Sequence, residues 1–225
     1  MNTKLTLGLT LAGLTSAQAG IIYSSGTLNA AVPDNNPNGY ASSIAVSGLG
    51  SPLTSVSVQL NLSGGYNGDL YAYLTFDGNL VTLLNRVGSG GGNTFGYGDA
   101  GLNVTLVDGA ANGNIHNYQN VAGYASLISS GAAFTPDSGG ITFAGAYNGL
   151  NPNGTWSLFL ADLSAGDQST LSSWSLDITA VPEPVNTALL VTGVLAAAVG
   201  LGRWWLQGRA LALTKSAPIS HELSA

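Results

Sequence analysis

The stretch Val56-Ser57-Val58-Gln59-Leu60-Asn61-Leu62 decides the fold class, because every second residue is aliphatic and each residue between is polar. A period of two is typical of a β-strand that buries one face and exposes the other. The same alternation recurs at 70–76, 102–106, 156–160 and 174–178. Turn-forming residues such as Asn, Pro, Gly and Asp separate these runs, so the strands are short.

These strands predict an all-β domain over residues 20–180, arranged as a jelly-roll-like antiparallel β-sandwich. Outside the two ends of the chain, no segment shows the 3.6-residue periodicity of an amphipathic helix,. Trp156 and Trp174 occupy core-facing strand positions, and we expect both to be packing residues. Tyr71 and Tyr73 occupy the other face of their strand, where they either pack against a second layer or stack on sugar rings.

The central region is acidic and the chain contains no cysteine. Nine aspartates stand against one arginine, Arg86, which gives residues 20–180 a formal charge of −8 with histidine neutral. Such a surface repels phosphate backbones, so the sequence predicts no nucleic-acid partner. Without cysteine, disulfides and thiolate metal sites are excluded, which leaves the core and a bound cation as sources of stability.

The amino end has the pattern of a secretory signal peptide, predicted over residues 1–19. Lys4 is followed by an apolar centre from Leu5 to Leu14, and Ala17-Gln18-Ala19 supplies the small residues of the cleavage site,. We therefore expect the exported protein to begin at Gly20.

The carboxyl end contains an uncharged stretch, residues 185–202, after the box Val181-Pro182-Glu183-Pro184. At ~1.5 Å per residue, a helix over this stretch is roughly 27 Å long, which is enough to cross a bilayer. Arg203 follows it, so we expect one transmembrane helix with a cytoplasmic basic tail at 203–225. The alternative of a buried core helix is disfavoured because no amphipathic stripe is present.

A Val-Pro-Glu-Pro box, a short hydrophobic helix and an arginine just beyond it resemble the PEP-CTERM sorting signal of Gram-negative bacteria. In that family a membrane-embedded protease of the exosortase type reads the signal. The resemblance implies a sorting motif of Val181, Pro182, Glu183, Pro184 and Arg203. It also implies a transient or permanent inner-membrane anchor, a final place at the cell surface or outside the cell, and an association with extracellular polysaccharide.

A second resemblance covers most of residues 33–178. The stretches Tyr66-Asn67-Gly68-Asp69-Leu70 and Asn153-Gly154-Thr155-Trp156-Ser157-Leu158, followed by Asp162, Gly166-Asp167 and Trp174, are similar to the P domain (P/Homo B domain). This domain accompanies subtilisin-like proprotein convertases and many secreted bacterial proteases. Its fold is a jelly-roll β-sandwich, in agreement with the alternation described above.

The sequence predicts that this chain is not an enzyme. His116 is the single histidine of residues 20–180, and no Gly-x-Ser-x-Gly elbow accompanies it, so a Ser–His–Asp triad is not expected. In proteins that carry a P domain, proteolysis belongs to a separate catalytic domain.

Calcium is the cofactor that the residues suggest, because carboxylates and carbonyls in turns suit an ion that takes about 6–8 oxygen ligands. The P-domain resemblance implies a structural calcium site, with Asp69 and Asp162, then Asp99 and Asp34, as candidate ligands. The alternative is that each aspartate caps its own turn.

Together these observations predict a non-catalytic exported protein of the cell surface or extracellular matrix, and a substrate of an exosortase-type sorting protease. Two alternatives remain open. One is an accessory P domain that binds and stabilises a separate subtilisin-like protease, and the other is a carbohydrate-binding module.

Overall fold

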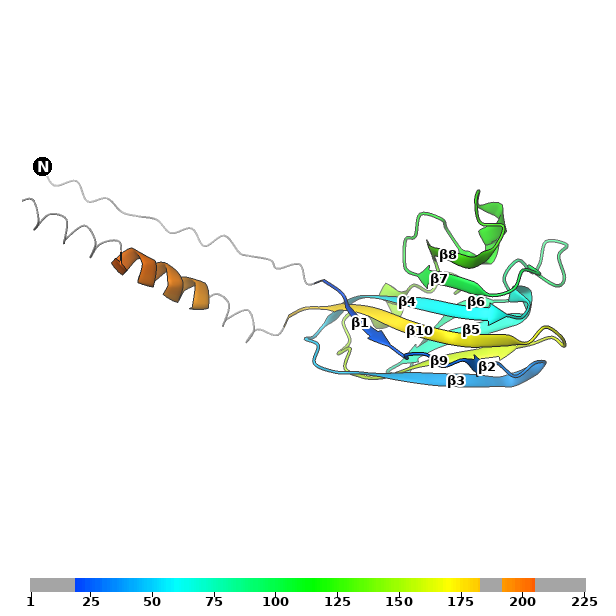
Figure 1. Cartoon of the computed structure of the whole chain (residues 1–225), viewed down its shortest axis with the longest axis horizontal. Helices are drawn as coiled ribbons and strands as arrows, with labels where there is room; N and C mark the ends of the chain where they lie inside the picture. Colours follow the sequence, from blue (N-terminus) through cyan, green and yellow to red (C-terminus); the bar gives the residue numbers. More distant parts are fainter. Residues whose placement is uncertain (1–18, 183–191, 205–225) are drawn as a thin grey trace, which may run out of the picture. The chain divides into compact units, whose positions relative to one another are not determined.

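The computed structural model describes residues 19–182 and 192–204 (Figure 1). The chain divides into two compact units, Met1–Val181 and Pro182–Ala225. Of the residues predicted to direct processing, Ala17, Glu183 and Pro184 lie outside the described part.

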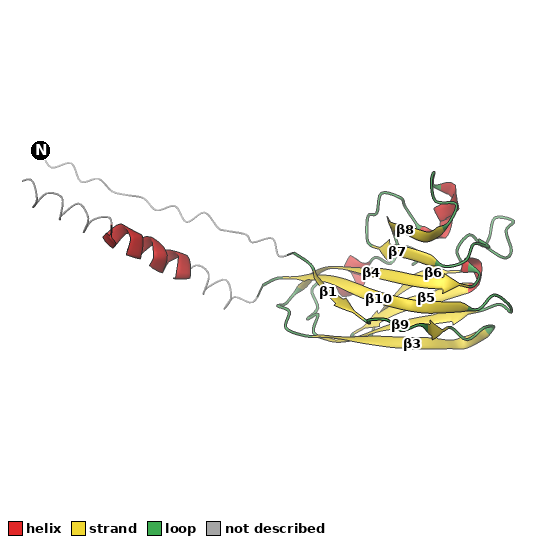
Figure 2. Cartoon of the chain, viewed as in Figure 1, coloured by secondary structure: helices red, strands yellow, loops and turns green. Residues whose placement is uncertain are grey.

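The first unit consists of two β-sheets packed as a sandwich (Figure 2). The six-stranded sheet has the order β1 (Ile21–Ser24), β10 (Ser169–Ala180), β4 (Leu53–Gly64), β7 (Leu102–Leu106) and β8 (Leu127–Phe134), with β2 (Ala30–Ala31) also paired to β10. The four-stranded sheet has the order β3 (Asn36–Val46), β9 (Gly154–Asp162), β5 (Leu70–Phe76) and β6 (Asn79–Asn85). The prediction of a mostly β, antiparallel-rich sandwich is confirmed.

The alternating aliphatic residues form the core between the two sheets. In β5 the residues alternate strictly between buried and half-buried, which is the pattern that the sequence predicted. Trp156 and Trp174 are 0% and 1% exposed, as expected of packing residues. The indole N–H of Trp156 donates to Pro152 O at 3.0 Å, and that of Trp174 donates to Ser42 Oγ at 2.9 Å. Each ring is therefore buried with its one polar group satisfied.

One strand pair differs from the expected antiparallel arrangement, since β7 and β8 run parallel. A parallel pair needs a crossover connection of a dozen or more residues. Residues 107–126 provide that length and include the 3₁₀ helix η2 (Ile115–Asn120). The antiparallel expectation was therefore wrong for this pair, because alternation within a strand does not reveal the direction of its neighbour.

Two short helical segments were also not predicted. The 3₁₀ turn η1 (Asn67–Asp69) leads into β5, and α1 (Phe143–Tyr147) lies between β8 and β9. The Asp108 carboxylate accepts hydrogen bonds from the N–H groups of Phe143 and Ala144 at 2.9 and 2.7 Å, which caps the start of α1,. Segments this short have no periodicity for the sequence to display.

The second unit contains a helix at 192–204, which includes Arg203. The first part of the predicted span, residues 185–191, lies outside the described residues. Among the described residues, no helix reaches the length and apolar character needed to cross a membrane.

Candidate functional site

Asp69 and Asp162 come together at the end of the sheet where β5 begins and β9 ends. The register pairs Leu70 with Asp162, and the backbone N–H of Leu163 donates to Asp69 O at 3.0 Å. Asp162 also pairs with Asn36 at the start of β3, which brings the preceding loop and Asp34 to the same end of the sheet. Three of the four predicted ligands therefore share one end of the sandwich.

Asp162 is the least satisfied carboxylate of this group. It is fully buried, and its Oδ1 accepts a long hydrogen bond from Ser164 N at 3.4 Å. Its Oδ2 has no hydrogen-bond partner within the described part of the chain. Burial, and then the charges of Asp34 and Asp69, raise the pKa of Asp162 to about 6 against the lowering effect of its backbone hydrogen bonds,. The fold thus favours either a proton or a cation at this carboxylate.

Two other buried side-chain oxygens at this end of the sandwich also lack a hydrogen-bond partner. They are Asn67 Oδ1, which lies in the turn that leads into β5, and Ser169 Oγ, at the first residue of β10. The backbone of Ser169 also hydrogen-bonds to Asp162. Buried polar atoms are nearly always paired with protein or ordered water. Three unpartnered oxygens at one end of the sandwich therefore mark a place where a water molecule or a cation would be stabilised.

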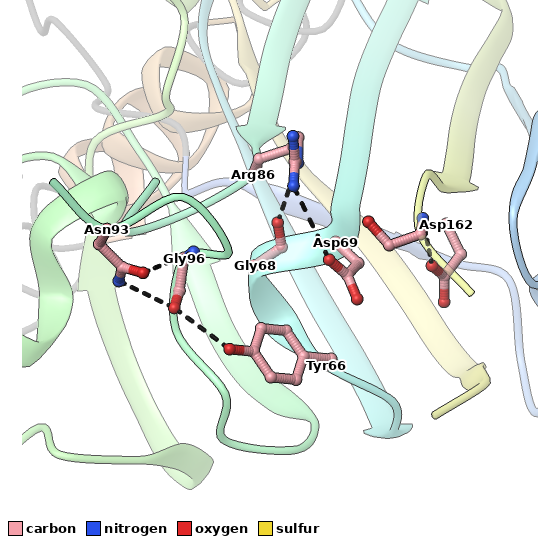
Figure 3. Close-up of polar contacts among 8 residues, drawn as sticks. Tyr66, Gly68, Asp69, Arg86, Asn93, Gly96 and Asp162 are labelled. Carbon is pink, nitrogen blue, oxygen red and sulfur yellow. Dashed lines mark hydrogen bonds and ion pairs between the residues drawn. The ribbon is translucent and has the colours of Figure 1, made fainter. Parts of the chain in front are cut away.

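Asp69 is partly neutralised by the one arginine of the sandwich. Arg86 Nη2 lies 4.0 Å from Asp69 Oδ1, and Arg86 Nε donates to Gly68 O at 3.3 Å (Figure 3). The Arg86 side chain is 35% exposed and that of Asp69 is 10% exposed. At this separation and exposure the ion pair is weak, so Asp69 retains much of its ability to bind a cation.

Asp34 joins two loops. Both of its carboxylate oxygens lie 3.0 Å from Gly166 N, so it ties the loop before β3 to the loop between β9 and β10. This long-range contact differs from the alternative in which each aspartate caps its own turn, and the charge of Asp34 also acts on Asp162.

Asp99 forms hydrogen bonds with a different set of side chains. Its carboxylate accepts hydrogen bonds from the Tyr118 hydroxyl, from Gln119 Nε2 at 2.7 Å and from Asn67 Nδ2 at 3.2 Å. Asn67 Nδ2 also donates to Gly101 O at 3.0 Å. Burial, followed by the hydrogen bond to Asp99, raises the pKa of the Tyr118 hydroxyl, which stays protonated as a donor. These bonds join η1, the loop before β7 and η2.

The arrangement fits calcium in its donors but does not form a closed metal centre. Across residues 19–182 and 192–204, no group of three or more His, Asp or Glu lies close enough together to hold a metal ion. The buried side-chain atoms that lack a partner in the described part of the chain are nevertheless all oxygens, the donor type that calcium takes,. The unpartnered Oδ2 of Asp162 is the atom that most needs a counter-charge.

The structure also contains a paired histidine that the sequence did not reveal. His116 Nδ1 lies 2.7 Å from Asp137 Oδ2, and His116 Nε2 lies 2.9 Å from Ser89 O. Twenty-one residues separate His116 from Asp137, so no local motif could have predicted the pair. His116 lies in η2, and its side chain is 25% exposed.

Comparisons with known proteins yield a distant structural similarity. No protein-family profile and no curated protein matches the chain. Among solved structures, the serine protease of Aeromonas sobria matches in complex with its chaperone (TM-score 0.40) and alone (TM-score 0.39). In both, identity is 18% and the match covers 70% of this chain but 26% of the protease chain. A likeness at this TM-score carries no argument about function.

Proposed function

We propose that this chain is a non-catalytic exported protein of the cell surface or extracellular matrix, sorted by an exosortase-type protease. Its folded part is a P-domain-like jelly roll. The observation that carries the proposal is the extent of the strands, because β1 begins after the predicted signal peptide and β10 ends before the predicted sorting box.

The strand boundaries support this proposal. Strand β1 begins at Ile21, two residues after the predicted cleavage at Ala19, and β10 ends at Ala180, immediately before the box that starts at Val181. Ile21 pairs with Ile178, so the chain enters and leaves the sandwich at the same end of one sheet. Cleavage after Ala19 and at the box would leave all ten strands intact.

The environment of His116 supports a non-catalytic role. Its two ring nitrogens contact Asp137 and the carbonyl of Ser89, and neither contacts a hydroxyl group. A general base of the Ser–His–Asp type needs one nitrogen free to accept the serine proton. We therefore assign His116 to the structure of the loop rather than to chemistry.

We further propose that a structural calcium ion binds near Asp162, with Asp69 as the second carboxylate. The support is the buried, unpartnered Oδ2 of Asp162, together with the two other unpartnered oxygens, Asn67 Oδ1 and Ser169 Oγ. In this role the ion would offset the buried charge and would have no part in a reaction.

Mass spectrometry of the C-terminal peptide of the protein from its host tests the proposed sorting. The expected result is a terminus near Glu183, with Arg203 to Ala225 absent. A variant with Pro182→Ala and Pro184→Ala is the matched control. It should keep the tail because the protease no longer recognises the box. The sandwich should stay folded because both positions lie beyond the last strand. An intact tail on the wild-type protein in the membrane fraction would contradict sorting and indicate a permanent anchor.

A further inference from the structure

Three aromatic side chains form a strip on the outer face of the four-stranded sheet. The register places Tyr73 of β5 directly opposite Phe159 of β9, and their rings are nearly parallel with centroids 4.7 Å apart. Tyr71, two residues earlier on β5, lies edge-on to Tyr73 at 6.0 Å. We call Tyr71, Tyr73 and Phe159 the aromatic strip. It faces away from the core, because the alternate residues of β5 and β9 are the buried ones.

The strip has polar groups that the protein itself does not use. The hydroxyls of Tyr71 and Tyr73 have no hydrogen-bond partner in the described part of the chain, whereas the Tyr23 and Tyr147 hydroxyls each donate to a backbone carbonyl at 2.7 Å. All three strip side chains are half-buried. Aromatic side chains that expose both ring surface and a free hydroxyl are typical of contact surfaces.

The backbone of β3 makes room for the strip. Gly39 has a φ of +53°, and a Cβ at this position would lie 2.7 Å from Phe159 Cζ and 2.1 Å from Leu160 O. A side chain here would displace the Phe159 ring and meet fixed backbone as well. Glycine is therefore required for the ring to occupy its place beside Tyr73.

The surroundings of the strip are uncharged. Strands β3, β5, β6 and β9 contain one charged residue, Asp162, and its side chain is buried. The outward neighbours are uncharged polar or apolar residues: Ser43, Thr75, Leu80, Thr82, Asn85 and Ser157. Ser43 and Ser157 hydroxyls lie 2.8 Å apart. No strand of this sheet therefore exposes a charged side chain on this face.

We propose that the aromatic strip binds a neutral polysaccharide. A sugar ring offers an apolar C–H face that packs on aromatic rings and hydroxyls that pair with Tyr, Ser and Thr side chains, which is the mixture found here. A polyanion is disfavoured, since the surrounding domain carries a formal charge of −8,. This inference rests on the proposed function, because a protein in the extracellular matrix is surrounded by polysaccharide.

Affinity electrophoresis tests the site with the processed protein recovered from its host. The gels contain a neutral polymer (dextran, hydroxyethyl cellulose or galactomannan) or anionic alginate. We expect retardation by at least one neutral polymer and none by alginate. Tyr73→Ala should weaken retardation at least about fivefold. Phe95→Ala is the matched control, because Phe95 is 68% exposed in the loop between β6 and β7, which contributes no residue to the strip, and should bind as the wild type does.

Tyr71→Phe with Tyr73→Phe keeps the rings and removes the free hydroxyls, so it separates hydrogen bonding from stacking and does not threaten the fold. The inference is overturned if no neutral polymer retards the wild type, or if Phe95→Ala weakens binding as much as Tyr73→Ala. A dimer that dissociates in Tyr73→Ala would assign the face to a second copy of the chain instead. Each variant is also checked by mass spectrometry at the sorting box. A wild-type protein that is processed normally but is retarded by no neutral polymer overturns this inference alone, and a wild-type protein that is retarded but not processed overturns the proposed function alone.

Discussion

At the scale of single residues, Asp162 shows how the fold can work against a charge. Its carboxylate is removed from water, accepts backbone hydrogen bonds from Ser164 and Ser169, and faces the charges of Asp34 and Asp69. These effects raise its pKa from 3.8 to about 6. The folded state therefore holds the proton more tightly than the unfolded chain does. The resulting stability is fully present below about pH 4 and is lost as the pH rises through 6.

The first prediction concerns Asp162→Asn. In chelator at pH 7 the variant should be more stable than the wild type by roughly 1–3 kcal/mol, because an amide removes the buried charge. Calcium should raise the melting temperature of the wild type and leave that of the variant unchanged. Differential scanning calorimetry from pH 4 to 7, with calcium and with chelator, measures both effects. Equal wild-type melting temperatures in calcium and in chelator would rule out the calcium proposal.

The second prediction concerns His116. Its two nitrogens face a carboxylate and a carbonyl, both acceptors, so the contacts are satisfied together only when both nitrogens carry protons,. Burial lowers the pKa of His116, but the hydrogen bonds to Asp137 and Ser89 and the charge of Asp137 outweigh it, and the net shift is upward. His116→Gln should cost about 1 kcal/mol at pH 6 and much less at pH 9, measured by thermal melts.

The sign follows from linkage, since a raised histidine pKa adds stability below its ordinary value of 6.5 that disappears as the pH rises through the folded-state pKa,. Asp137→Asn is the matched control and should reduce the same pH dependence. A His116→Gln penalty of equal size at pH 6 and pH 9 would show that the ring acts through packing alone.

At the scale of elements, the glycine-rich segment 88–98 is more closely held than its composition suggests. Gly68 N donates to Tyr97 O at 2.9 Å, and Tyr97 N donates to Val87 O at 3.0 Å. The Tyr97 ring packs edge-on against Tyr118 with centroids 4.8 Å apart. A Cβ at Gly68 would lie 2.2 Å from the backbone oxygen of Phe95. The segment thus packs directly on η1.

The third prediction is that Gly68→Ala destabilises the sandwich by about 1–3 kcal/mol, because the added methyl group meets fixed backbone and forces η1 and the segment apart. Chemical denaturation measures the loss. Gly91→Asn is the control in the same segment, since a Cβ there meets nothing within 4 Å and asparagine tolerates the φ of +55°,. An equal loss of stability in the two variants would show that the packing of the segment on η1 is not the cause.

At the scale of the whole molecule, the first and last strands of the sandwich pair with each other. Strand β10 pairs with β1, β2 and β4, so it joins both ends of the chain to the middle of the six-stranded sheet. The backbone N–H of Val181 also donates to Pro52 O at 2.9 Å. The sandwich unit therefore ends at the first residue of the predicted sorting box.

The fourth prediction compares two truncations of the exported chain. A chain that ends after Val181 should melt as the processed protein does, because every pair of β10 is retained. A chain that ends after Trp174 should fail to fold cooperatively, because it loses the β1 pairs from Ser24↔Ser175 to Ile21↔Ile178 and the buried Leu176 and Ile178,. Circular dichroism during heating distinguishes them. A lower melting temperature for the first truncation would place part of the box within the fold.

The sequence was sufficient for the strands whose buried and exposed residues alternate. Strands β4, β5, β7, β9 and β10 were predicted from period-two patterns, and both tryptophans lie in the core as expected. Strand β6 was not predicted, because Leu83 and Leu84 are both buried next to a register shift and the alternation breaks there. A pattern within one strand is local information, so it identifies the strand but not its neighbours.

The candidate sites divide in the same way. The acidic residues were recognisable by type, but only the tertiary structure showed that Asp162 is buried and lacks a partner while Asp99 is satisfied by Tyr118 and Gln119. The pairing of His116 with Asp137 and the meeting of Phe159 with Tyr73 join residues far apart in the chain. The sequence by itself determined a β-rich domain, its acidic charge and the expected signals at its ends. The tertiary structure decided which side chains meet, because strand order and register depend on long-range packing that no local pattern encodes.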